Sequence, residues 1–366
     1  MAYMSVFFCN FAFMKPRIII DANIPYIRGA FDDVAEVEYL VAKDITHDKA
    51  MNADALIVRT RTQCNAALLE GSCVKMIATA TIGIDHIDTE YCDTHNIQWT
   101  NAPGCNAESV AQWVGSALAV WANEHNCSLV GKTIGIVGHG HVGKRVERLA
   151  HKLGMNVLLN DPPLALENPD KYVDLHTIAR ECDVITFHTP LTREGKFATH
   201  HLADEEFFML MPPGAIFINA ARGEVINEDA LIAASPKLGA VVIDTWCNEP
   251  NINEDLLEIT DIATPHIAGY SYQGKENATI MAVRAVARYM GFKALRYYRP
   301  RFDEEGHEPV KLDLKGKNHG EIAAVFQYNY PIFTDDFRLR MNLAGFEKLR
   351  AEYQYRREIV YVDNNL

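Results

Sequence analysis

The chain has 366 residues, of which 48% are hydrophobic and 23% are charged, and its formal net charge is −13 at pH 7. This length allows two or three domains, and the composition is typical of a globular protein. The negative charge argues against nucleic acid as a partner and against a basic membrane-surface role. It does not argue against small anionic substrates, because these need only local positive charge.

The eight cysteines include no pair with the C-x-x-C spacing, so the sequence predicts neither a zinc site nor a redox motif, and no other metal site is expected. Reduced thiols in a cytoplasmic protein are the simplest interpretation. No apolar run approaches the length of a transmembrane helix. Residues 1–13 are apolar and aromatic but lack a basic start and a cleavage site, so we expect an N-terminal extension ahead of a natural start at Met14. A membrane anchor is the alternative interpretation of this segment.

Short apolar runs at 17–20, 55–58 and 75–78 predict three strands with polar residues at their ends. Helical patterns lie between them, from residue 66 onward and over 87–95. We therefore expect a small α/β substrate-binding domain over residues 14–106. A second helical pattern over 272–290 is expected to return the chain to this domain, which would make it discontinuous, with residues 272–295 as its second part.

A long helix predicted over 107–126 opens the second domain, which we place at residues 107–271. Apolar runs at 133–137, 156–159, 183–187, 215–219, 239–244 and 261–264 alternate with helical stretches. This alternation predicts a doubly wound parallel sheet. From about residue 292 the alternation is lost, so residues 296–366 are predicted to form a separate C-terminal domain with its clearest helix over 344–357.

The first of these strands leads into a glycine-rich turn that is typical of dinucleotide binding. Gly138 allows a tight turn, Gly140 lets the backbone approach a pyrophosphate, and Gly143 lets the next helix pack closely. The helix that begins near His141 and Val142 offers free N–H groups to the pyrophosphate. The second strand ends at Asp161, whose carboxylate would accept hydrogen bonds from ribose and repel a 2′-phosphate. The sequence therefore predicts NAD rather than NADP.

The remaining strand ends supply the candidate catalytic residues, because ligands of open parallel sheets bind beyond the carboxyl ends of the strands. The polar side chains found there are, in chain order, Thr189, Arg222, Asp244 with Glu249 just beyond it, and His266. Oxidation of a secondary alcohol by NAD needs a base, and imidazole titrates near neutrality. We therefore assign His266 as acid/base, Glu249 as its orienting partner, and Arg222 as the two-pronged anchor of a substrate carboxylate.

Three segments resemble signatures of the D-2-hydroxyacid dehydrogenase family: 219–231 its arginine signature, 244–250 its glutamate signature, and 264–269 its histidine signature. Four segments resemble, more narrowly, the branch that acts on 4-phosphoerythronate in vitamin B6 (pyridoxal phosphate) biosynthesis: 102–107, 160–163, 186–191 and 266–271. The resemblance implies a Rossmann NAD domain, a flavodoxin-like substrate domain and a small α+β C-terminal dimerisation domain.

The same resemblance implies NAD-dependent oxidation of 4-phospho-D-erythronate to (R)-3-hydroxy-2-oxo-4-phosphobutanoate by a cytoplasmic homodimer. It implies substrate contacts from Thr60, Thr81 and Tyr270. It also implies NAD contacts from Asp161, Thr189, Ala220, Ala221, Arg222, Asp244 and Gly269. The phosphate of such a small phosphorylated 2-hydroxy acid needs a cation, and Arg59 and Arg61 are candidates, with surface ion pairs as the alternative.

Two other functions remain open at this point. One is a related D-2-hydroxyacid dehydrogenase that acts on 3-phosphoglycerate or glycerate. The other is a NAD-sensing binding protein without catalysis, like the transcriptional corepressors that share this fold. A pure oligomerisation scaffold is disfavoured, because it would not need the ordered Arg222, Glu249 and His266.

Overall fold

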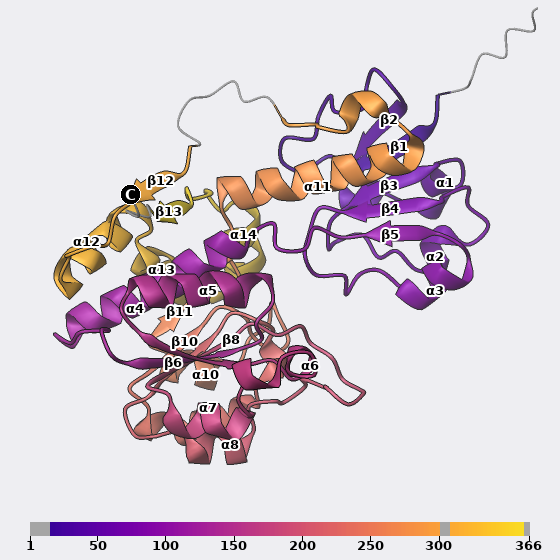
Figure 1. Cartoon of the computed structure of the whole chain (residues 1–366). Coiled ribbons are helices and arrows are strands. Elements are labelled where there is room, and N and C mark those ends of the chain that lie inside the picture. The colour runs from indigo at the N-terminus through magenta and orange to yellow at the C-terminus, as the bar shows by residue number, and fades with distance from the viewer. Residues whose placement is uncertain (1–14, 301–307, 362–366) are drawn as a thin grey trace, which may run out of the picture. The chain divides into compact units, whose positions relative to one another are not determined.

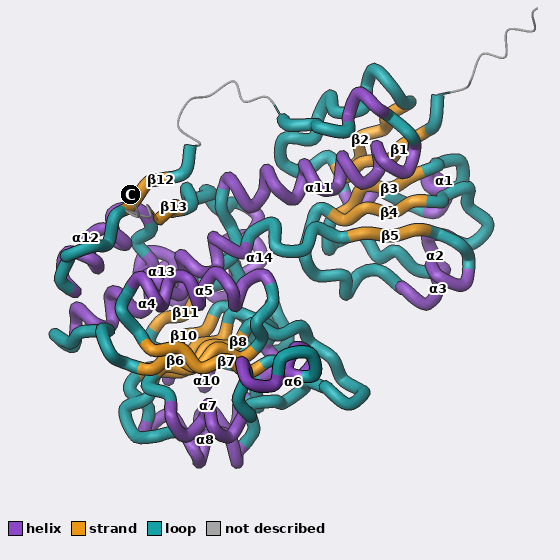
Figure 2. Tube along the Cα trace, viewed as in Figure 1, coloured by secondary structure: helices purple, strands orange, loops and turns teal. Residues whose placement is uncertain are grey.

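The structure is a computed structural model that describes residues 15–300 and 308–361 (Figure 1). The predicted extension over residues 1–13 lies outside the described residues. The chain divides into two compact units. Unit 1 comprises Met1–Cys105 and Lys275–Asp303, and unit 2 comprises Asn106–Gly274 and Glu304–Leu366. Each unit holds its own parallel sheet (Figure 2).

Unit 1 is built on a five-stranded parallel sheet in the order β2-β1-β3-β4-β5, which is the order of flavodoxin-like folds. Its strands are β1 (Arg17–Asp21), β2 (Glu36–Leu40), β3 (Ala55–Val58), β4 (Met76–Thr79) and β5 (Gln98–Thr100). Its helices are η1 (Ala42–Asp44), α1 (His47–Ala50), α2 (Ala66–Leu69), α3 (Thr89–Thr94), most of α11 (Tyr272–Met290) and η5 (Lys293–Leu295). The helix predicted from residue 66 onward stops after one turn, and the sequence patterns missed β2 and β5.

Unit 2 is built on a six-stranded parallel sheet in the order β11-β10-β9-β8-β6-β7, as predicted for a doubly wound fold. The strands are β6 (Thr133–Val137), β7 (Asn156–Asn160), β8 (Val184–Phe187), β9 (Ile216–Asn219), β10 (Ala240–Ile243) and β11 (Ile262–Ala263). The helices are α4 (Ala107–Glu124), α5 (His141–Lys152), α6 (Pro162–Ala165), η2 (Pro169–Lys171), α7 (Leu175–Glu181), α8 (Glu205–Leu210), η3 (Gly223–Val225), α9 (Glu228–Ala234), η4 (Ser235–Lys237) and α10 (Glu254–Ile259). The strand order reverses at β6, which lies between β7 and β8, and this is where such sheets bind ligands.

The central strands of the six-stranded sheet are buried on both faces, and successive side chains point to opposite sides of the sheet. Ile216 and Ile218 of β9 join the core under α4 and α5, whereas Phe217 joins the core under α7 and α8. Several helices begin where a side chain accepts a hydrogen bond from the first-turn backbone, as expected for an N-cap. These caps are Asp88, Asp161, Asp174, Asp204, Asn227, Asn253 and Asn318.

The C-terminal segment packs onto unit 2 and contributes to both of its cores. It contains β12 (Val310–Leu312), α12 (His319–Asn329), α13 (Ile332–Met341), η6 (Leu343–Gly345), α14 (Phe346–Ala351) and β13 (Ile359–Tyr361). Phe326 lies in the α4 core, and Leu339 and Phe346 lie in the opposite core. The predicted helix over 344–357 is wrong beyond Ala351, and the longer helices α12 and α13 were missed. That residues 296–366 form a domain of their own stays a prediction.

Within the described ranges, none of the helices combines the length and the apolar character that crossing a membrane requires. The same ranges hold no group of three or more His, Cys, Asp or Glu side chains arranged to bind a metal ion.

Candidate functional site

The glycine turn after β6 has the geometry of a pyrophosphate cradle. Gly138 has a φ of +91°, which favours glycine, and a Cβ there would lie 2.8 Å from the backbone of His188. A Cβ on Gly143 would lie 2.2 Å from the Gly138 carbonyl oxygen, so α5 can approach the strand only without a side chain at this position. A Cβ on Gly140 would meet no atom within 4 Å. The backbone at Gly140 is therefore open to a ligand at the N-terminus of α5.

Polar groups around this turn fit NAD as well. Asp161 follows β7, and its carboxylate accepts from the His139 N–H at 2.8 Å and from the Leu164 N–H at 3.1 Å. The carboxylate is thus held beside the glycine turn, with lone pairs left for ribose hydroxyls. On the other side of the switch point, the hydroxyl of Thr189 is buried and, among the described residues, has no hydrogen-bond partner. A bound dinucleotide would satisfy it.

The two histidines of the glycine turn differ in their surroundings. His139 is 1% exposed, and its Nε2 donates to Glu147 at 2.8 Å while its Nδ1 lies 3.0 Å from the Tyr172 hydroxyl. His139 is therefore a buried structural residue of the turn. His141 is the exposed first residue of α5, at the predicted cofactor side.

Arg222 follows β9, in a loop that is held close to the loop carrying Glu249. The Asn219 side chain accepts from the Ala221 N–H at 3.0 Å and donates to the Arg222 carbonyl at 3.0 Å. Gly223 has no room for a Cβ, which would lie within 2.2 Å of the Trp246 backbone. The half-buried Arg222 guanidinium donates to the Ala221 carbonyl at 2.8 Å.

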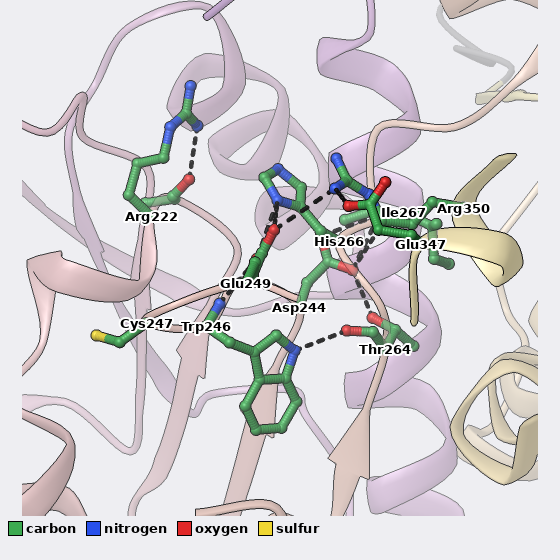
Figure 3. A network of polar contacts seen from close by, with 12 residues as sticks. Arg222, Asp244, Trp246, Cys247, Glu249, Thr264, His266, Ile267, Glu347 and Arg350 are labelled. Carbon is green, nitrogen blue, oxygen red and sulfur yellow. Dashed lines mark hydrogen bonds and ion pairs between the residues drawn. The ribbon is translucent and has the colours of Figure 1, made fainter. Parts of the chain in front are cut away.

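Glu249 and His266 form the predicted pair. His266 Nδ1 lies 2.8 Å from Glu249 Oε2 and 3.1 Å from Oε1, and the Trp246 N–H donates to Oε1 at 3.0 Å (Figure 3). Because a carboxylate only accepts, Nδ1 carries hydrogen and Nε2 is left for a substrate proton. Burial by itself would raise the pKa of Glu249. The charge and hydrogen bond of His266, the Trp246 N–H and Arg350 outweigh burial, and the pKa is lowered.

The loop that carries His266 is held by the buried Asp244. His266 has a φ of +56°, an uncommon conformation for a residue with a side chain. The Asp244 carboxylate accepts from the N–H groups of Ile267 at 2.8 Å and Ala268 at 3.0 Å, and from the Thr264 hydroxyl at 2.5 Å. Burial raises the pKa of Asp244 although His266 and these donors oppose the shift. Asp244 thus orients the histidine loop, and its contact with NAD stays a prediction.

Two further predicted residues lie on the same loop. A Cβ on Gly269 would lie 1.9 Å from the Asn106 side-chain nitrogen, so any larger residue here would require the Asn106 side chain to move. The Tyr270 ring packs edge-on against the rings of Tyr353 and Tyr355, with centroids 5.8 and 6.3 Å away. Contacts of Gly269 with NAD and of Tyr270 with substrate stay predictions.

The predicted substrate residues of unit 1 lie at the ends of its strands. Thr60 follows β3 and is exposed. Thr81 follows β4, and its hydroxyl lies 2.6 Å from that of Thr79 and donates to the Gly83 carbonyl at 3.0 Å. The Arg59 Nε donates to the carboxylate of the fully buried Asp21 at 2.9 Å. Arg59 therefore pairs with a buried carboxylate rather than in a surface ion pair, and its contact with the substrate phosphate stays a prediction.

Sequence reasoning missed Arg350, which belongs to α14. Its Nη1 lies 3.7 Å from Glu249 Oε2 and 3.1 Å from the carboxylate of Glu347 (Figure 3). It follows no strand and matches no signature, so no pattern in the sequence could place it beside Glu249 and His266.

Comparison with known proteins identifies the family. Residues 109–268 match the family "D-isomer specific 2-hydroxyacid dehydrogenase, NAD binding domain". The chain is 47% identical to the erythronate-4-phosphate dehydrogenase of Bacteroides thetaiotaomicron over 346 residues, which are 93% of this chain and 97% of that relative. It is 39% identical to the protein of the same name in Proteus mirabilis over 355 residues, which are 93% and 92% of the two chains.

Solved structures agree with this assignment. The fold is similar to the D-lactate dehydrogenase of Aquifex aeolicus complexed with NAD and lactic acid, with a TM-score of 0.64 and 26% identity over 77% of this chain and 98% of that one. It is also similar to the NAD-bound 3-phosphoglycerate dehydrogenase of Entamoeba histolytica, with a TM-score of 0.65 and 26% identity over 79% and 99% of the two chains. The chain therefore belongs to the erythronate-4-phosphate dehydrogenase family and is an NAD-dependent oxidoreductase of the D-2-hydroxyacid dehydrogenase type.

Proposed function

We propose that this chain oxidises 4-phospho-D-erythronate to (R)-3-hydroxy-2-oxo-4-phosphobutanoate, a step of pyridoxal phosphate biosynthesis. The observation that carries the proposal is the Glu249–His266 pair, 2.8 Å apart, on a loop next to the sheet edge that fits NAD. The names of the relatives support the choice of substrate.

In the proposed reaction, bound NAD⁺ supplies the acceptor for the hydride that leaves C2. Arg222 binds the substrate carboxylate, since a planar guanidinium matches a carboxylate with two parallel hydrogen bonds. His266 Nε2 takes the hydroxyl proton, and Glu249 keeps the ring oriented and stabilises its charged form through Nδ1. In Figure 3 the Arg222 and His266 side chains extend toward the same side of the view.

The cation for the substrate phosphate is part of the proposal. Arg59 remains a candidate together with Arg61, although Arg59 pairs with buried Asp21. An Arg59→Ala variant should lose more activity with phosphorylated than with unphosphorylated hydroxy acids. It should also unfold more easily, because it leaves a buried carboxylate without its partner. An equal loss with both kinds of substrate would remove Arg59 from the phosphate site.

The proposed homodimer is supported by an apolar stripe on α13. Phe333, Phe337 and Met341 follow one another at four-residue intervals, so they share one face of the helix, and they are 37%, 62% and 69% exposed. Exposed apolar patches of this kind commonly mark protein interfaces. A second copy of the chain is the partner that the resemblance implies.

We also infer a cytoplasmic location. The described cysteines are all free thiols, as expected for a reducing compartment.

A substrate panel tests the function and separates it from the alternatives. NADH formation is followed by its absorbance with 4-phospho-D-erythronate, 3-phosphoglycerate and D-glycerate. The proposal expects the highest kcat/KM with 4-phosphoerythronate. A preference for 3-phosphoglycerate or glycerate would instead favour a related dehydrogenase. NAD binding without turnover of any hydroxy acid would favour a NAD-sensing binding protein.

A further inference from the structure

Arg350 lies beside the catalytic pair without belonging to any strand end. Its Nη1 is 3.7 Å from Oε2 of Glu249, the same oxygen that lies 2.8 Å from His266 Nδ1. Glu249 therefore has a backbone donor on Oε1, from Trp246, and both the His266 Nδ1–H and the Arg350 guanidinium near Oε2. A carboxylate held from both sides has little freedom to turn away from the imidazole.

The guanidinium is held in place by its own helix. Glu347, one turn earlier in α14, lies 3.1 Å from Nη1, and the guanidinium carbon lies 5.9 Å from the centre of the Phe346 ring. The Arg350 side chain is only 21% exposed, and that of Glu249 is 17% exposed. A charge pair screened from water in this way acts more strongly than an exposed one.

The segment that follows α14 fixes the position of Arg350 relative to the histidine loop. The buried Arg356 donates to the Ile267 carbonyl at 3.2 Å and also to the Ala268 carbonyl. Its own carbonyl accepts from the Tyr272 N–H at 3.0 Å. The C-terminal segment is thus bonded to the loop immediately after His266 and cannot shift independently of it.

We propose that Arg350 is a positioning residue of this active site, which keeps Glu249 ionised and directed at His266 Nδ1. The inference rests on the proposed function, because it assigns Arg350 a role in that reaction. It also makes the C-terminal segment, which lies outside residues 109–268 of the matched domain, part of the catalytic unit.

A pH effect follows, because an adjacent cation favours the charged form of a carboxylate. Without the positive charge of Arg350, the hydrogen-bonded Glu249–His266 pair takes up a proton more easily, so activity is lost at a higher pH on the acid side. The charged and titratable neighbours of Glu249 are His266 and Arg350, and Arg350 in turn faces Tyr270 and Glu347. Asp244 acts on His266, and Cys247, Glu228 and Glu224 lie on the neighbouring loops. Only Arg350 changes in the test.

The experiment compares Arg350→Met, Arg350→Lys and Lys348→Ala in the full chain. Methionine keeps an apolar side chain without the charge, and lysine keeps the charge without the planar, two-pronged guanidinium. Lys348→Ala is the control, because it removes an exposed cation from the same helix. The kcat, the KM and the pH profile of kcat/KM are measured with the best substrate of the wild type. NADH affinity is measured by fluorescence and folding by thermal unfolding.

Arg350→Met is expected to lower kcat on the order of tenfold to a hundredfold, as for a displaced catalytic group, with a smaller change in KM and unaltered NADH affinity. The acid limb of its pH profile should move to higher pH. Arg350→Lys should restore the acid limb and part of kcat, and Lys348→Ala should match the wild type. If the methionine variant does not fold, the lysine variant must still show a reduced kcat.

The proposal is overturned if Arg350→Met keeps the wild-type kcat and acid limb, or if its loss is confined to KM. Failure of the wild type to oxidise 4-phosphoerythronate while it turns over another hydroxy acid would contradict the proposed substrate. The role of Arg350 would then still be decided with that other acid.

Discussion

Gly140 and Gly143 lie in the same turn, yet a methyl group would meet different surroundings at the two positions. At Gly143 the Cβ would lie 2.2 Å from a backbone oxygen, whereas at Gly140 it would project into open space. We therefore expect Gly143→Ala to destabilise the fold of unit 2. Gly140→Ala should fold normally but bind NADH more weakly, because its methyl group occupies the pyrophosphate side of the turn.

Fluorescence titration with NADH and thermal unfolding measure the two effects separately. Tight NADH binding by Gly140→Ala would contradict the placement of the dinucleotide along this turn.

The residues that sequence reasoning found and those it missed differ in a physical way. The positions of Arg222, Glu249 and His266 could be predicted, because parallel strands bring their carboxyl ends to one edge of the sheet. Residues that follow successive strands are therefore expected to lie near one another. Arg350 could not be predicted, because its place beside Glu249 depends on how α14 packs. Likewise, the hydrogen-bond partners of His139 are Glu147 on α5 and Tyr172, and no local sequence pattern predicts these contacts.

At the scale of single elements, a buried carboxyl lies immediately before β13. Glu358 precedes β13, is 5% exposed and accepts from the Ser271 hydroxyl at 2.7 Å. Burial raises its pKa from 4.5 to about 7. Because the pKa of Glu358 is higher in the folded than in the unfolded state, the stability that this group contributes is fully present below pH 4.5. It is lost as the pH rises through about 7, a loss of about 3 kcal/mol.

Glu358→Gln should remove the contribution of this carboxyl to the pH dependence of the free energy of unfolding. Urea unfolding at several pH values between 5 and 8 checks it. The free energy of unfolding of the wild type should fall more steeply with pH than that of the variant. Parallel curves would show that Glu358 is ionised in the folded protein throughout this range.

The elements that could be predicted are those with a strong apolar run. The six strands of the large sheet of unit 2 were placed to within about one residue at each end, because most of them are buried and rich in aliphatic side chains. Strands β2 and β5 were missed because they are edge strands with polar residues and only partial burial. The helical pattern over 344–357 was misleading, because Tyr353 and Arg356 bond to distant parts of the chain, Asp335 and Ile267, rather than continue a helical face.

At the scale of the whole molecule, the α13 stripe makes the proposed dimer testable. Phe337→Glu places a charge in the centre of the stripe and should yield a monomer in size-exclusion chromatography with light scattering. Met209→Glu is the matched control, since Met209 is 72% exposed on α8, away from the stripe. An unchanged dimer in Phe337→Glu, or a monomer in the control as well, would contradict an interface at α13.

The central claim is that His266, held by Glu249, is the acid/base of a hydride-transferring enzyme. The most direct test is the kcat of His266→Asn with 4-phospho-D-erythronate, measured together with NADH affinity. Asparagine cannot exchange a proton near neutrality, so kcat should fall on the order of 10²- to 10⁴-fold, while NADH affinity stays close to that of the wild type. A variant that keeps substantial turnover would contradict the assignment.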